Sequence, residues 1–142
     1  MLPKWHILFG AIFSLIFYWF FFIPIFQSIL IFLSSVLIDF DHYMSGAVRN
    51  KTLNLKKLYF WHKSLPKHHK PMMHIFHSIE FIGVIAVLSF YFNFFLFILI
   101  GIVFHSILDI IDLFFTKRMN CREFSLIRFL VLRRRYPNKY FK

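Results

Sequence analysis

The sequence has little of what usually holds a small soluble or secreted domain together. Its single cysteine, Cys121, excludes a disulfide within the chain, and we expect an inert thiol there. Only six of the 142 residues are acidic, and the chain contains no internal repeat and no low-complexity linker. The length suits a single domain over residues 1–142.

Long apolar stretches with almost no charge occupy much of the chain. They cover residues 7–26, 29–38, 79–92 and 94–111. The sequence is 59% hydrophobic and contains 23 phenylalanines, more than an ordinary soluble core requires, so we predict an integral membrane protein. The first stretch follows Lys4 as the core of a signal peptide would, but it is too long and too aromatic, and we expect a retained membrane helix.

Four membrane helices are expected, in an all-α bundle with interfacial amphipathic segments. Their expected ranges are about 5–22, 24–40, 72–92 and 94–115, with turns at Pro24 and Asn93. The loop 41–71 is polar and basic, and the pattern of residues 53–63 predicts a short helix lying in the interface plane. The tail 116–142 predicts another interfacial amphipathic segment.

The basic residues lie on one side of this arrangement. All 17 lysines and arginines fall in the N-terminal segment, the loop 41–71 or the tail, and the two opposite turns carry none. The positive-inside rule then predicts a multi-pass protein of the cell (inner) membrane with both termini in the cytosol. Because the basic residues flank apolar spans, the net charge of +11 favours membrane lipid as the anionic partner, and no specific nucleic-acid partner is expected.

The second expected helix ends in an unusual cluster of polar residues. The sequence Ile38-Asp39-Phe40-Asp41-His42 places two carboxylates and an imidazole within four residues. A single acid there would simply end a membrane helix at the water boundary. Two acids and a histidine need another explanation, because charge near the hydrocarbon is costly and usually functional. Oxygen and nitrogen ligands together suit Zn²⁺ or Mn²⁺ better than Ca²⁺, which prefers oxygen alone.

Polar groups of the same kind occur in the third and fourth expected helices. His105, Asp109 and Asp112 fall on one stripe of a helix, where each ionised group costs about 2.5–3.5 kcal/mol on membrane-insertion scales. His74 and His77 share a face at the start of the preceding helix. All these groups lie near the cytosolic ends of their helices. The pattern resembles the way helix bundles build metal sites in their cores.

The expected roles divide into ligands, catalytic groups and head-group contacts. The predicted metal ligands are Asp41, His42, His74, His77, His105 and Asp109, and His6, His69 and Glu80 are further candidates. Asp39 and Asp112 are the catalytic candidates, each as ligand, orienting group or general base. Lys67, Lys70 and the tail arginines could attract a phosphate. The simpler interpretations are an interfacial residue for His6, solvated loop residues for His62 and His68, and a buried acid paired with a histidine for Glu80.

These motifs resemble those of a known family, the LexA-binding, inner-membrane-associated metal-dependent hydrolases. A histidine four residues before a glycine is matched by His6 and Gly10, and an acid-x-acid-His motif by Asp39, Asp41 and His42. A final His-x-x-x-Asp is matched by His105 and Asp109. The His-basic-Gly-x-x-His-Ser motif is matched in part: residues 69–74 have the spacing with Pro71 in place of glycine, and the His-Ser pair falls later, at His77-Ser78. The register of this third motif therefore leaves His69, His74 and His77 competing for one or two roles.

The resemblance covers residues 6–112 and implies a metal-dependent hydrolase. One or two divalent ions, Zn²⁺ or Mn²⁺, would activate a water molecule as the nucleophile. The depth of the site suggests an amphiphilic substrate, and the nearby basic residues favour a lipid phosphoester, so a phosphoesterase activity is expected. The alternative is a metal-binding or metal-transporting membrane protein without chemistry. A haem protein is less consistent with four aspartates in one layer, and a scaffold protein would leave the buried acids unexplained.

Overall fold

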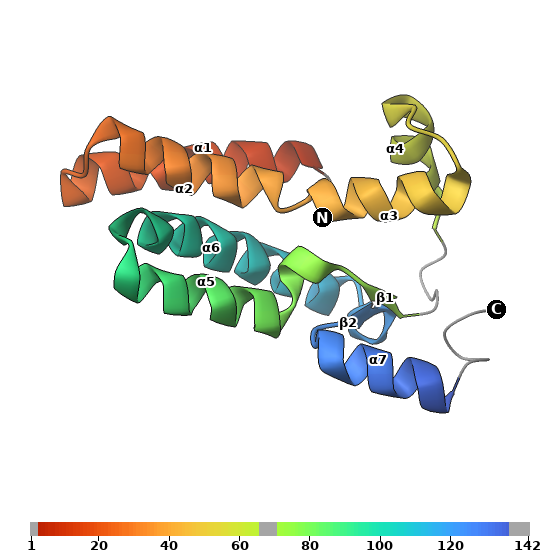
Figure 1. Cartoon of the computed structure of the whole chain (residues 1–142). Helices are drawn as coiled ribbons and strands as arrows, with labels where there is room; N and C mark the ends of the chain where they lie inside the picture. The colour runs from red at the N-terminus through yellow and green to blue at the C-terminus, as the bar shows by residue number, and fades with distance from the viewer. Residues whose placement is uncertain (1–2, 66–70, 137–142) are drawn as a thin grey trace.

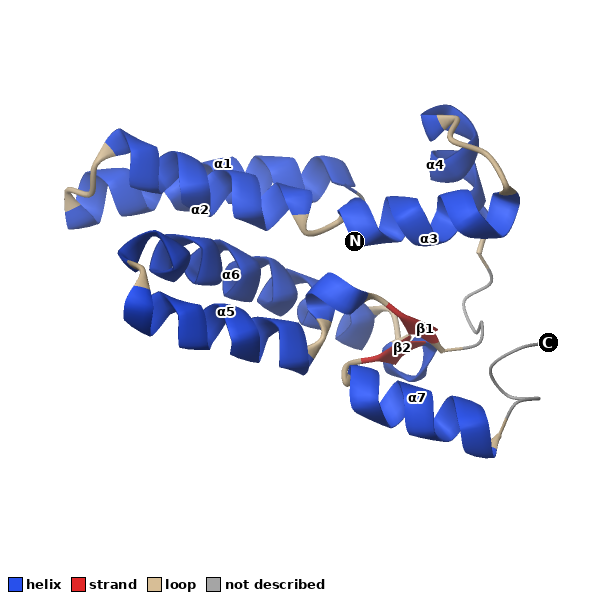
Figure 2. Ribbon diagram, in the orientation of Figure 1, coloured by secondary structure: helices blue, strands red, loops and turns tan. Residues whose placement is uncertain are grey.

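The chain is all-α, with two very short strands (Figures 1 and 2). The computed structural model describes residues 3–65 and 71–136. Its elements in chain order are α1 (Pro3–Phe21), α2 (Ile25–Leu37), α3 (Phe40–Asn50), α4 (Leu55–Ser64), β1 (Met72–Met73), a 3₁₀ turn η1 (Ile75–His77), α5 (Ile79–Tyr91), α6 (Asn93–Phe115), a 3₁₀ turn η2 (Met119–Cys121), β2 (Arg122–Glu123) and α7 (Leu126–Arg135).

Helix α6 lies at the centre of the packing. It contacts α2 most extensively, with α5 and α1 also against it, and α1 packs on α2 (Figure 1). The α2–α6 approach is close because α6 has Gly101 at the contact. A Cβ atom at Gly101 would collide with the carbonyl oxygen of Ile31 and the hydroxyl of Ser34. A buried cluster of Ile38, Ile85 and Ile102 joins α6 to its neighbours.

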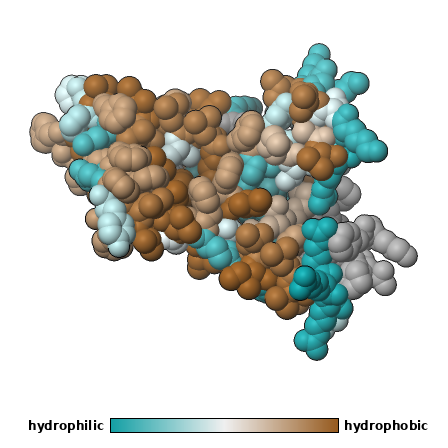
Figure 3. Space-filling view, in the orientation of Figure 1, coloured by the Kyte–Doolittle hydropathy of each residue, from teal (hydrophilic) through white to brown (hydrophobic). Residues whose placement is uncertain are grey.

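Among the residues that the structure describes, three helical stretches are long and apolar enough to cross a membrane: Lys4–Phe21, Ile25–Asn50, which comprises α2 and α3, and Asn93–Phe115. Many of their large apolar side chains face outward, and Figure 3 shows them as a broad hydrophobic surface with the hydrophilic residues gathered towards one end. Helix α5 is equally apolar but has 13 residues, about 20 Å at 1.5 Å per residue. A hydrocarbon core is about 30 Å thick, so the expected fourth span stays a prediction.

The structure differs from the sequence-based expectation in the segment 41–71. We expected a loop with one short helix, but the chain turns helical again at Phe40, after a break at Ile38 and Asp39, and forms α3 to Asn50. The short interfacial helix was expected over 53–63, and α4 occupies Leu55–Ser64. Its first turn is capped by the side chain of Asn54, which accepts a hydrogen bond from the backbone of Lys57 at 3.1 Å.

The third apolar helix begins seven residues later than expected, at Ile79 instead of residue 72. Residues Met72 and Met73 are extended because they pair with Arg122 and Glu123 in a parallel two-stranded ladder. Helix α5 then starts from Ser78, whose hydroxyl accepts a hydrogen bond from the backbone N–H of Phe81. The expectation that His74 and His77 share a helical face was therefore wrong. They lie in the extended and 3₁₀ backbone before the helix.

The C-terminal segment is fastened to the start of α5. The pairing of β1 with β2 continues in a hydrogen bond from the backbone N–H of Ile79 to the carbonyl of Phe124, 2.9 Å long. The carboxylate of Glu80 then accepts hydrogen bonds from the hydroxyl of Ser125 and the backbone N–H groups of Leu126 and Ile127, the first residues of α7. An acid at a helix N-terminus satisfies free N–H groups and complements the helix dipole. These contacts fix β2, and with it Arg122, beside the segment that carries His74 and His77.

Candidate metal centre

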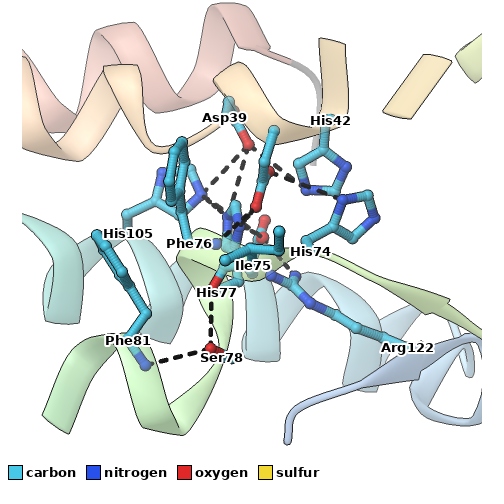
Figure 4. Close-up of polar contacts among 12 residues, drawn as sticks. Asp39, His42, His74, Ile75, Phe76, His77, Ser78, Phe81, His105 and Arg122 are labelled. Atoms are coloured by element: carbon cyan, nitrogen blue, oxygen red, sulfur yellow. Dashed lines mark hydrogen bonds and ion pairs between the residues drawn. The ribbon is translucent and has the colours of Figure 1, made fainter. Parts of the chain in front are cut away.

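The polar residues of five segments converge on one place, at the end of the molecule where the short strands lie (Figures 1 and 4). The junction of α2 and α3 supplies Asp39, Asp41 and His42. The extended and 3₁₀ segment before α5 supplies His74 and His77, α6 supplies His105 and Asp109, α1 supplies His6 and β2 supplies Arg122. Most of these side chains are buried, and His105 is fully so. Their ligand atoms form two groups that could each hold a metal ion.

The first group consists of Asp39, His77, His105 and Asp109. The Nε2 atoms of His77 and His105 are 3.0 Å apart. The Nε2 atom of His105 lies 3.4 Å from Asp39 Oδ1 and 3.5 Å from Asp109 Oδ2. The Nε2 atom of His77 lies 3.8 Å and 3.6 Å from the same two oxygens. In a regular tetrahedron whose ligands lie 2.0–2.2 Å from zinc, ligand atoms are about 3.3–3.6 Å apart. Three of the five separations fall in this range, and the other two, 3.0 Å and 3.8 Å, lie on either side of it, so the set is close to that of one tetrahedral cation.

Hydrogen bonds to the opposite ring nitrogens determine which tautomers these histidines adopt. The Nδ1–H of His105 donates to the backbone carbonyl of Ser35 at 2.7 Å, since a carbonyl oxygen can only accept. The Nδ1–H of His77 donates to Asp41 Oδ2 at 3.1 Å, and the same oxygen accepts the backbone N–H of Phe76. The two Nε2 atoms face each other at 3.0 Å, and either a proton on one of them or a cation between them makes this contact favourable. Hydrogen bonding of the outer ring nitrogen to a carboxylate or a backbone carbonyl is typical of metal-bound histidines.

The second group consists of Asp41, His42 and His74. Asp41 Oδ1, the oxygen turned away from His77, lies 3.7 Å from His74 Nδ1. Asp41 Oδ1, His42 Nδ1 and His74 Nδ1 are all buried, and none has a hydrogen-bond partner among the residues that the structure describes. Buried polar atoms without partners are rare in folded proteins, and a bound cation would satisfy all three. Asp41 thus contacts the first group through one oxygen and belongs to the second through the other.

Burial keeps the histidines outside the apolar helices neutral. Burial, together with the charge of Arg122 and against the opposing effect of Asp41, lowers the pKa of His74 to about 3. Burial also lowers the pKa of His77, in part against its hydrogen bond to Asp41. Both rings are therefore unprotonated at neutral pH. That is the form in which imidazole binds a metal.

Two further groups surround Asp109. His6 is buried, stacks on the ring of His105 with centroids 4.0 Å apart, and places Nε2 at 3.2 Å from Asp109 Oδ1. Arg122 places Nη1 at 2.6 Å from Asp109 Oδ2. We had considered His6 a further candidate and had not singled out Arg122. The arginine comes from a short irregular segment without periodicity, where the sequence gives no signal beyond its charge.

The remaining sequence candidates divide between the cavity wall and other places. Asp112 and His62 line the cavity beside the two groups but belong to neither. Glu80 lies outside both groups, with its carboxylate engaged at the start of α7. His68, His69, Lys67 and Lys70 lie outside the described residues, so their expected roles stay predictions.

A cavity of about 270 Å³ opens beside the two groups. Its lining includes Asp39, His42, His74 and Asp109. Apolar and aromatic side chains, mainly from α3, α4 and the end of α6, and two arginines also line it. A cavity with both polar and apolar lining suits a ligand of mixed character.

No family model, no curated protein and no solved structure matches this chain. The resemblance to the LexA-binding membrane hydrolases therefore stays a prediction from the motifs. The residues of those motifs do lie together: His6, Asp39, Asp41, His42, His105 and Asp109 are all within or next to the two groups. Of the three histidines left open by the third motif, His74 and His77 are in the groups.

Proposed function

We propose that this protein is a membrane-embedded, metal-dependent hydrolase that cleaves a lipid phosphoester. The observation that carries the proposal is the pair of Nε2 atoms of His77 and His105, 3.0 Å apart, each turned inward by a hydrogen bond at its Nδ1. Two carboxylates, from Asp39 and Asp109, complete a four-atom set around the same point. Both imidazoles therefore present Nε2 to the same point, as two ligands of one ion would.

The donor set suits a borderline divalent ion, Zn²⁺ or Mn²⁺, because it mixes imidazole with carboxylate. Asp39, His77, His105 and Asp109 would hold one ion, and Asp41, His42 and His74 would hold a second. When bound, such ions lower the pKa of coordinated water towards neutrality and polarise a phosphoryl oxygen. Asp41 orients His77 through one oxygen, so it links the two groups and adjusts the basicity of a ligand in the first.

The reaction is the addition of water to phosphorus. The oxygen of water forms a bond to phosphorus, the bond from phosphorus to the alcohol oxygen breaks with its electron pair, and a proton from the water ends on the leaving alcohol. Asp112 lines the cavity without belonging to either group, and we assign it the transfer of that proton as general base. Asp39 belongs to the first group, and we assign it to the metal.

The same proposal includes the placement in the membrane. Helix α5 would act as the fourth span, and the extended and 3₁₀ segment before it would help it reach across. Both termini and the site would face the cytosol in the cell (inner) membrane, because the basic residues gather at one end (Figure 3). A lipid would then approach with its head group at the interface, where the cavity lies. Membership of the LexA-binding hydrolase family belongs to this proposal and is supported by the order of the motifs.

The second candidate function is a metal-binding or metal-transporting protein without chemistry, and a row of buried serines is the one observation that could support transport. Buried serines at 14, 28 and 35 lie between the site and the opposite end of the helices. Each of their hydroxyls donates to a backbone carbonyl, to Ala11, Ser14 and Phe32 respectively. A transport path needs groups that exchange partners with a moving ion. Hydroxyls already engaged with the backbone serve this poorly, so we favour the hydrolase.

The test is to purify the full chain in detergent, measure its metal content, and assay a panel of lipid phosphoesters with and without a chelator. Turnover should require metal, and Asp41→Asn should abolish it because one group loses a ligand and His77 loses its orienting charge. Glu123→Gln is the matched control, a buried acid outside both groups. A folded, metal-loaded protein that cleaves no member of the panel would favour simple metal binding. Equal activity in the Asp41 variant and the wild type would refute the site.

A further inference from the structure

Two arginines, Arg118 and Arg122, lie in the wall of the cavity, and the proposed metal groups do not need them as ligands. Arg122 is deeply buried, with a side-chain exposure of 8%. One of its donors, Nη1, is bound to Asp109. That contact does not account for the buried Nε–H of Arg122, nor for that of Arg118.

Both side chains have buried nitrogen atoms without a partner. The Nε atoms of Arg118 and Arg122 are buried, and neither has a hydrogen-bond partner among the residues described here. A guanidinium carries five N–H donors and no acceptor, and its planar fork matches the oxygens of a carboxylate or phosphate. An unmet buried donor is costly, most of all on a charged group. An anion in the cavity would satisfy these donors.

The backbone holds the two arginines in fixed positions. The N–H of Arg118 donates to the carbonyl of Leu113 at the end of α6, and the carbonyl of Arg118 accepts from the N–H of Cys121, both at 2.9 Å. Arg122 follows at once in β2, where it pairs with Met72. The turn η2 therefore brings both guanidinium groups to the same wall, beside the first metal group. Such preorganisation is what binding an oxyanion requires.

The charges around the cavity also favour an anion once metal is bound. Four carboxylates, those of Asp39, Asp41, Asp109 and Asp112, stand against the two guanidinium groups. The protein groups alone therefore contribute two net negative charges. One divalent ion neutralises them, and a second leaves two positive charges, which a doubly charged phosphate monoester would balance. A phosphodiester, with one negative charge, would leave the site positively charged.

Part of the cavity lining is apolar. It includes Leu55, Leu58, Tyr59 and Trp61 from α4, the short helix that packs against α3. Leu58 is buried, whereas Leu55 is largely exposed at the rim. If a ligand bound the arginines with its anionic group, an aliphatic chain attached to that group could lie against these apolar side chains. Burial of the chain against these side chains would strengthen binding with each added methylene group.

We propose that Arg118 and Arg122 form a phosphoryl-binding subsite, and that the ligand of this cavity is a phosphate monoester with an apolar chain. The chain would lie along α4, and the phosphoryl oxygens would accept hydrogen bonds from the guanidinium groups, beside the residues that would hold the metal. The identity of this ligand as the substrate rests on the proposed hydrolase function. Its binding does not, so the two can be tested apart.

The experiment measures binding to the full chain in neutral detergent with Zn²⁺ or Mn²⁺ present, by calorimetry or by tryptophan fluorescence. The probes are inorganic phosphate, a lysophosphatidic acid, and the monoacylglycerol with the same chain and no phosphate. The variant is Arg118→Gln, chosen because the arginine that donates to Asp109 is Arg122. Its matched control is Arg128→Gln, which removes the same charge from an exposed position on α7, where the side chain is 71% exposed. Metal content is measured in every sample.

The lysophosphatidic acid should bind more tightly than either other probe, since it alone offers both the phosphate and the chain. Arg118→Gln should weaken its binding about tenfold or more, with metal content unchanged, because a hydrogen bond between charged groups is lost. Arg128→Gln should change it by less than about twofold, as exposed charges contribute little.

Three results would overturn the inference. If metal-loaded Arg118→Gln bound the lysophosphatidic acid as tightly as the wild type does, the arginine subsite would be refuted. If the wild type bound inorganic phosphate as tightly as the lysophosphatidic acid, the apolar side chains would not contribute to binding. If it bound the monoacylglycerol as tightly as the lysophosphatidic acid, the phosphate would not contribute. Both comparisons use the wild type alone. Arginine-dependent binding without cleavage would support the subsite and refute the hydrolase.

Discussion

The close approach of α2 and α6 at Gly101 supports a sharp prediction about the site. A methyl group at this position would collide with the carbonyl oxygen of Ile31 and would lie 3.2 Å from its carbonyl carbon. These are backbone atoms of α2, which cannot rotate away as a side chain can, so the two helices must separate. His105 lies one turn further along α6, and its Nδ1–H donates to the carbonyl of Ser35, one turn further along α2, at 2.7 Å. Gly101→Ala should therefore lengthen or break that hydrogen bond.

The expected cost has two parts. Overpacking a close helix contact destabilises by about 1–3 kcal/mol. Loss of the hydrogen bond that orients a metal-bound histidine lowers metal affinity by about 10–100-fold. Thermal unfolding measures the first part, and competition with a chromophoric chelator for Zn²⁺ measures the second. The matched control is Gly83→Ala in α5, where a Cβ would meet nothing within 4 Å.

The control should leave metal affinity unchanged and should stabilise the fold slightly, by about 0.5–1 kcal/mol, because alanine is the better helix former. If Gly101→Ala matched Gly83→Ala in both unfolding temperature and zinc affinity, the helices would not be in the close contact described. If it lowered stability without changing zinc affinity, the coupling through His105 and Ser35 would be wrong.

Four shorter predictions follow from the site and the charge distribution. Asp41→Asn should lower both the activity and the amount of bound metal measured by elemental analysis, and chelation of the metal from the wild type should cause the same loss of activity. Asp112→Asn should lower turnover and leave the metal content near that of the wild type; equal metal loss in both variants would place Asp112 among the ligands. In metal-free protein, the folded state binds fewer protons than the unfolded state between the pKa of about 3 of His74 and its usual value of 6.5, so the free energy of unfolding should fall as the pH drops through that range, and less steeply in His74→Gln. Reporter fusions at residues 24 and 93 should read the outer compartment and a fusion at 142 the cytosol; an external reading at 142 would contradict the proposed placement.

The apolar helices could be predicted well from the sequence because burial in lipid leaves a strong signal. The first and last long helices differ from their expected ranges by at most two residues at each end. The signal weakens where the chain leaves the apolar environment. Helix α3 was read as loop because its residues are polar, although an amphipathic helix needs only one apolar face.

Contacts between distant residues account for most of the remaining differences. Met72 and Met73 are extended through pairing with residues 50 positions later, and nothing local to them predicts that. Glu80 caps α7 through Ser125, again far away in sequence, so a candidate ligand proved to be a structural acid. The ligand types were predictable, since histidine and aspartate in apolar helices are costly without a partner. Their division into two groups depended on the backbone before α5.

The wide spread of the site along the chain bears on how the protein is made. The groups that meet around Asp109 come from positions as early as His6 and as late as Arg122. Segments of a chain become available in the order of synthesis, so Asp39 and Asp41 exist before α6 does. Asp41 can meet His42, His74 and His77 at that stage, but Asp39 still lacks His105 and Asp109, two of its partners in the first group. A chain interrupted before α6 could complete only the second group, and the first can take up its metal only after α6 has been synthesised and packed.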